Sequence, residues 1–68
     1  MIIVRVKFHD WNGYDRVVNV TSENLESLLK CKTREGIMVL ASKYIKRRYT
    51  ECMHIISCEI IEKEQNND

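Results

Sequence analysis

Apolar and largely polar residues alternate at the start of the chain. The apolar positions are Ile2, Val4, Val6 and Phe8, and the residues between them are Ile3, Arg5, Lys7 and His9. Successive side chains of a β-strand point to opposite faces of a sheet, so this period predicts a strand with one buried and one open face. Such a strand needs neighbours to pair with and a second layer to cover its apolar side.

The segment after this strand predicts a β-hairpin. Asn12-Gly13 tolerates the positive φ angles of a tight turn, and a β-branched second strand follows. Its valines are Val17, Val18 and Val20. A two-residue loop would pair Phe8 with Val17, whereas one extra loop residue, or a bulge, pairs Phe8 with Val18. We favour the second register because it keeps most of the apolar set on the buried face.

Two helical segments are predicted next. Thr21 or Ser22 is a candidate N-cap for a short helix, and Thr33 is a candidate N-cap for a longer one over residues 34–49. Helical spacing places five apolar side chains of the longer segment on one face: Ile37, Leu40, Ala41, Tyr44 and Ile45. Lys43, Lys46 and Arg47 fall on the other face, which we expect to be hydrated.

Residues 53–62 predict a third strand, followed by a polar tail from residue 63 to 68. Strict alternation places Ile56, Cys58 and Ile60 on one face, and Ile55, Ser57, Glu59 and Ile61 on the other. The expected fold is α+β, a two-layer ββ(α)αβ domain over residues 1–62 with helices on one face of a three-stranded sheet. If the short helix is only a prelude, the strand order is 2-1-3; if both helices form full layers, the third strand reverses.

The 68-residue length leaves little room for an enclosed active site, so we expect no enzyme, no catalytic residue and no cofactor. Cys52, His54 and Cys58 share a strand parity but run along the strand, unlike the ligands of a structural zinc site, so we expect no metal. Three cysteines without a CxxC pair favour a reducing cytoplasm. No apolar run is long enough for a membrane span.

The face of the sheet opposite the helices is a candidate binding surface. Its expected partner-binding residues are Ile3, Val17, Ile55 and Ile61 on the strands, with Trp11 and Tyr14 at the hairpin tip. Trp and Tyr are enriched in binding hot spots, and apolar stripes on antiparallel sheets accept partners or second copies of the chain. The competing interpretation is that Trp11 folds back over the small core.

Charge is segregated along the chain. Residues 30–48 carry seven basic side chains and one acidic, for a net charge of +6, while residues 49–68 carry −4. The expected binding residues for nucleic acid or an acidic partner are Lys43, Lys46, Arg47 and Arg48. Such a cluster could neutralise phosphates, although cations at a helix C-terminus also complement the helix dipole.

The segments MIIVRVKF, WNGY, KYIKRRY and IISCEII together resemble the layout of small proteins carried by phages and mobile elements. Some of these inhibit host defence enzymes, anti-CRISPR proteins among them. The resemblance is one of size and pattern over most of the chain, without a diagnostic motif, so no functional residue is carried over. It implies a protein of the host cytoplasm that binds a larger host protein and blocks it sterically.

Overall fold

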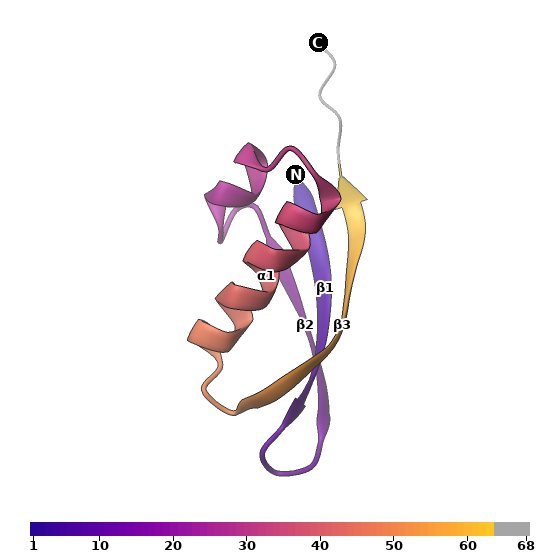
Figure 1. The fold of residues 1–68 in the computed structure, drawn as a ribbon, viewed down its shortest axis with the longest axis vertical. Coiled ribbons are helices and arrows are strands. Elements are labelled where there is room, and N and C mark those ends of the chain that lie inside the picture. The colour runs from indigo at the N-terminus through magenta and orange to yellow at the C-terminus, as the bar shows by residue number, and fades with distance from the viewer. Residues whose placement is uncertain (64–68) are drawn as a thin grey trace.

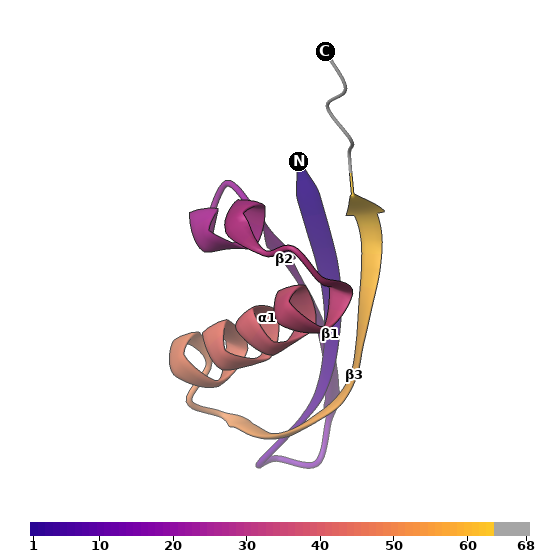
Figure 2. The same ribbon diagram turned by 45° about the horizontal axis from the view of Figure 1, so that its top comes forward.

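A computed structural model describes residues 1–63, with the backbone alone for residues 62 and 63. In chain order the elements are β1 (Ile2–Asp10), β2 (Asp15–Thr21), the 3-10 helix η1 (Glu26–Lys30), α1 (Arg34–Arg48) and β3 (Cys52–Lys63). The strands form one antiparallel sheet, and both helical segments lie on one side of it (Figures 1 and 2). The predicted α+β class is confirmed. The predicted tail lies outside the described residues, apart from Lys63, which ends β3.

The strand order is β2-β1-β3, so the first predicted segment is the central strand. Both neighbours run antiparallel to β1, which makes β2 and β3 parallel to each other. A parallel pair needs a crossover connection, and η1 with α1 supplies it. The short helix and the long one therefore belong to a single crossover, and the predicted strand order 2-1-3 is correct.

The hairpin register differs from both predicted alternatives. Phe8 lies opposite Arg16, and Val6 lies opposite Val18. Compared with the favoured pairing of Phe8 with Val18, β2 is displaced by two residues. Because side chains alternate with a period of two, this displacement changes the partners but keeps Val18 and Val20 on the core side. The Arg16 guanidinium consequently sits 5.6 Å from the centre of the Phe8 ring.

Strand β3 departs from strict alternation at three register shifts, which leave Met53, Ile56 and Ile61 without partners on β1. All three side chains are exposed. The shift at Ile56 exchanges the predicted positions of two isoleucines. Ile55 was expected on the open face but packs against the core, and Ile56 was expected in the core but is exposed. An unpaired residue in a bulge moves the side chains before it to the opposite face until the next shift, which here falls at Met53.

The core lies between the sheet and the helical layer. Its buried apolar side chains are Ile2, Val4, Val6, Phe8, Val20, Leu28, Ile37, Ala41 and Ile45. Leu40 and Tyr44 pack against this cluster, so the predicted apolar face of α1 is confirmed. Within residues 1–63, no helix is long and apolar enough to cross a membrane.

Of the two predicted helix N-caps, the one for the long helix is confirmed and the one for the short helix is wrong. The Thr33 hydroxyl accepts a hydrogen bond from the Gly36 N–H at 3.0 Å, which confirms this N-cap of α1. Neither Thr21 nor Ser22 caps η1, which begins after Leu25 without a side-chain cap. The Ser22 hydroxyl instead accepts from the Ile2 N–H at 3.1 Å and satisfies a backbone donor at the sheet end.

Candidate interaction surfaces

The hairpin tip is held by the buried carboxylate of Asp10, whose side chain is only 3% exposed. Asp10 Oδ1 accepts from the backbone N–H of Asn12 at 3.0 Å and of Tyr14 at 2.9 Å. The Trp11 N–H donates to the Glu51 carbonyl at 3.0 Å, which ties the tip to the start of β3. Gly13 supplies the positive φ of 91° that the loop requires. The tip is thus a hydrogen-bonded turn with a fixed backbone path.

This turn presents two aromatic side chains to solvent. Trp11 is 69% exposed and Tyr14 is 67% exposed, so Trp11 does not fold back over the core. Sequence reasoning identified both aromatics but missed Asp10, which organises the turn they stand on. A usable signal was present, because Asp side chains commonly accept hydrogen bonds from backbone N–H groups two residues further on.

The open face of the sheet does not form the expected apolar stripe. Ile3 is half-buried and Val17 is exposed, but Val17 pairs with Lys7, four residues along β1 from Ile3 and roughly 14 Å away. Arg5 lies between them along β1 and is 3.8 Å from Glu59, while Lys7, the partner of Val17, lies 4.0 Å from Asp15. Of the other two predicted residues, Ile55 is on the core side and Ile61 is exposed at a bulge.

A polar cluster lies at the hairpin end of this face. His9 Nδ1 is 2.8 Å from Asp15 Oδ1, and the His9 and His54 rings are 5.6 Å apart between centroids. The hydrogen bond with His9 lowers the pKa of the Asp15 carboxyl below its ordinary value, and the charge of Lys7 acts in the same direction. Asp15 therefore stays ionised at neutral pH, and its carboxylate lies 4.0 Å from the Lys7 ammonium.

The basic cluster predicted at the end of α1 is divided by the structure. All four side chains are exposed, but only Lys43 and Arg47 line a common groove. The Arg48 guanidinium instead lies 5.9 Å from the centre of the Tyr49 ring. None of the seven basic side chains in residues 30–48 forms an ion pair with a described residue, whereas Arg5, Lys7 and Arg16 all do. The helical layer thus carries uncompensated positive charge.

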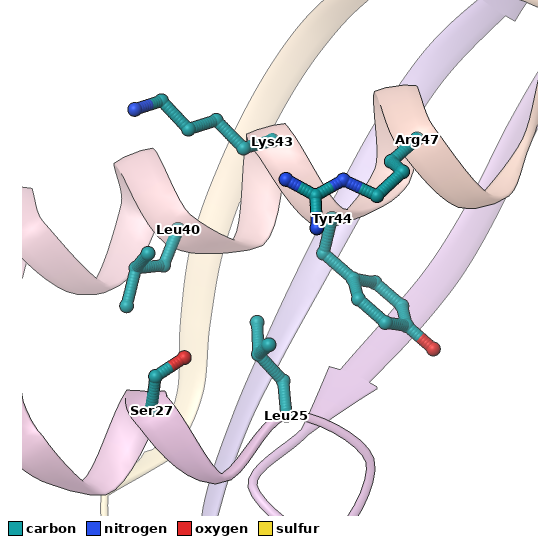
Figure 3. A pocket seen from close by; sticks show the side chains of 6 residues that line it. All are labelled: Leu25, Ser27, Leu40, Lys43, Tyr44 and Arg47. Carbon is teal, nitrogen blue, oxygen red and sulfur yellow. The ribbon is translucent and has the colours of Figure 1, made fainter.

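The groove lies between the start of η1 and the second half of α1 and has a volume of about 140 Å³. Leu25 and Ser27 point toward α1, from which Leu40 and Tyr44 point back (Figure 3). Lys43 and Arg47 complete the lining: the Arg47 guanidinium extends over Tyr44, and the Lys43 side chain runs along α1 with its ammonium directed away from Leu25 and Ser27. Sequence reasoning found the two basic residues but missed the groove, because its walls come from two segments whose relative position no local pattern reveals.

The cysteines occupy structural positions. Cys52 and Cys58 both pack against the core, and Cys58 Sγ lies 3.1 Å from Ser42 Oγ. Burial raises the pKa of the Cys52 thiol, which disfavours the reactive thiolate. His54 is exposed on the strand. In the described part of the chain, no group of three or more His, Cys, Asp or Glu side chains is placed to hold a metal ion.

Comparison of the chain with protein-family models, curated proteins and solved structures finds no match.

Proposed function

We propose that this chain is a small non-enzymatic interaction protein that docks on a larger protein through the hairpin tip. The observation that carries the proposal is the exposure of Trp11 and Tyr14 on a turn braced by the buried Asp10 carboxylate. Large aromatic side chains dominate binding hot spots, and a turn that is already ordered loses little entropy when a partner binds.

The partner class that we propose is a host defence or nucleic-acid-handling protein of the CRISPR-effector kind, blocked by steric occlusion in the host cytoplasm. Support for this class is the resemblance to small phage and mobile-element proteins. The loop between β1 and β2 projects at the end of the domain opposite the N-terminus (Figure 1), and a projecting loop with two exposed aromatic side chains suits insertion into a cleft of a larger protein. A homodimer through the open sheet face stays a prediction, and the ion pairs across that face do not favour it.

The test is affinity capture by the tagged chain from a nuclease-treated lysate of cells that carry the gene. Wild type is compared with the Trp11→Ala, Tyr14→Ala double variant. A matched control, Leu29→Ala with Val39→Ala, removes exposed apolar side chains from the helical layer. We expect one stoichiometric protein on the wild type and the control, and at least about a tenfold loss on the double variant. Equal retention by all three would exclude the hairpin tip as the docking site.

A second candidate function is nucleic-acid binding by the basic end of α1. The specific observation in its favour is that Lys43, Lys46, Arg47 and Arg48 form no ion pairs with described residues. Phosphate contacts release counterions, so affinity for single- or double-stranded oligonucleotides should fall steeply as salt rises. Fluorescence anisotropy measures this dependence, and an absence of binding even at low salt would rule the function out.

A further inference from the structure

We propose that the groove between η1 and α1 binds an acidic peptide segment that carries one large apolar side chain. This site is separate from the hairpin tip, because no tip residue lines the groove. The inference therefore goes beyond the proposed function and does not depend on it.

The size and lining of the groove define the apolar part of this ligand. Leu25, Leu40 and the Tyr44 ring supply the apolar walls, and Ser27 adds one hydroxyl. The volume of about 140 Å³ is less than half of the roughly 300 Å³ at which small-molecule pockets begin. It suits a single aliphatic side chain inserted as an anchor, because a side chain that fills a pocket of this size is well packed and loses its contact with water.

The charge at the rim defines the polar part of the ligand. Lys43 and Arg47 stand one helical turn apart, and both lack an ion-pair partner among the described residues. Glu26, which stands between Leu25 and Ser27 in the sequence, does not line the groove. Carboxylates of the peptide on either side of its anchor residue could pair with the Lys43 ammonium and the Arg47 guanidinium. A guanidinium can bind a carboxylate through two parallel hydrogen bonds.

The same features favour an acidic peptide over nucleic acid. Single-stranded nucleic acid binds by stacking its bases on exposed aromatic rings along a basic track. Among the described residues that line the groove, Tyr44 supplies the only ring, and it is half-buried. The exposed Arg48 lies against Tyr49 instead of extending the rim. Two cations around an apolar floor match an anchor flanked by carboxylates better than they match a phosphate backbone.

The experiment uses fluorescein-labelled peptides made of Asp and Glu, one with a central leucine and one with serine in its place. Fluorescence anisotropy compares them with an oligothymidylate of equal charge on the intact chain. We expect the leucine peptide to bind about tenfold more tightly than the serine peptide, because the anchor buries apolar surface. Amide shifts in NMR spectra should be centred on Leu25, Leu40 and Tyr44.

Three variants locate the site. Lys43→Glu with Arg47→Glu should weaken binding of the leucine peptide by more than tenfold. Lys32→Glu with Lys46→Glu changes the net charge equally and should have a smaller effect on this affinity. Ser27→Leu fills the groove without altering charge and should remove the preference for leucine. Circular dichroism establishes that each variant is folded. The proposal is overturned by equal affinity for the two peptides, by equal effects of the two charge reversals, or by tighter binding of the oligothymidylate.

Discussion

The Oδ1 atom of Asp10 lies 2.9 Å from the backbone nitrogen of Tyr14, and the Asp10 N–H donates to the Tyr14 carbonyl at the same distance. The two residues that bracket the loop are therefore bonded through both side chain and backbone. This pairing closes the hairpin and fixes the backbone that carries the exposed aromatics. It also places the turn beyond the end of the regular ladder, whose last pair is His9 with Asp15.

Replacing the Asp10 side chain should destabilise the hairpin. Asp10→Ala removes two hydrogen bonds to a buried carboxylate and a charge 3.8 Å from Arg16 Nη1, so we expect a loss of about 2 to 3 kcal/mol in the free energy of unfolding. Asp10→Asn keeps an acceptor oxygen and should lose less. Urea denaturation gives both values, and an Ala variant as stable as wild type would show that the carboxylate does not hold the turn.

The single tryptophan should report its exposure directly. Trp11 is largely exposed, so acrylamide should quench its fluorescence in the native protein almost as efficiently as in the urea-unfolded chain. Binding of a partner at the hairpin tip should then protect the indole from quencher. A native state in which Trp11 is strongly shielded, without any partner, would show that the side chain covers the core instead.

The pKa of Asp15 should depend on its histidine partner. The hydrogen bond with His9 holds this pKa below 3.8, so His9→Gln should raise it, and His54→Gln should raise it less because His54 contributes only a weaker charge effect. A carboxyl group whose pKa is lower in the folded chain than in the unfolded chain stabilises the fold at pH values above its unfolded-state pKa. This contribution is lost as the pH falls through the folded-state pKa. NMR titration of the Asp15 carboxyl measures both shifts; identical titrations in the three proteins would contradict this account.

The bulge in β3 predicts unequal effects of two adjacent isoleucines. Ile55 packs against the core, so Ile55→Ala should cost about 2 kcal/mol of stability. Ile56 is exposed at the bulge, and Ile56→Ala should stay within about 0.5 kcal/mol of wild type. Thermal or urea denaturation measures the stability of the two variants. A larger loss for Ile56→Ala than for Ile55→Ala would support the strict alternation expected from the sequence and contradict the bulge.

Periodic and local signals were sufficient for most of the fold. The alternation around Val4 and Val6 marked the central strand, and helical spacing from Ile37 to Ile45 identified the buried face of α1. Thr33 was recognisable as an N-cap because its hydroxyl acts within one turn of its own backbone. Trp11 and Tyr14 could be named as candidate binding residues from residue type and turn position, but their exposure could not.

What the sequence by itself determined was therefore the order and type of the elements, since these follow from short-range spacing. The tertiary structure decided the hairpin register, the bulge that exchanges Ile55 and Ile56, and the groove between η1 and α1. Each of these depends on how one segment sits against another. A bulge adds an unpaired residue whose position is set by the neighbouring strand, and a groove exists only where two packed segments leave space between their side chains.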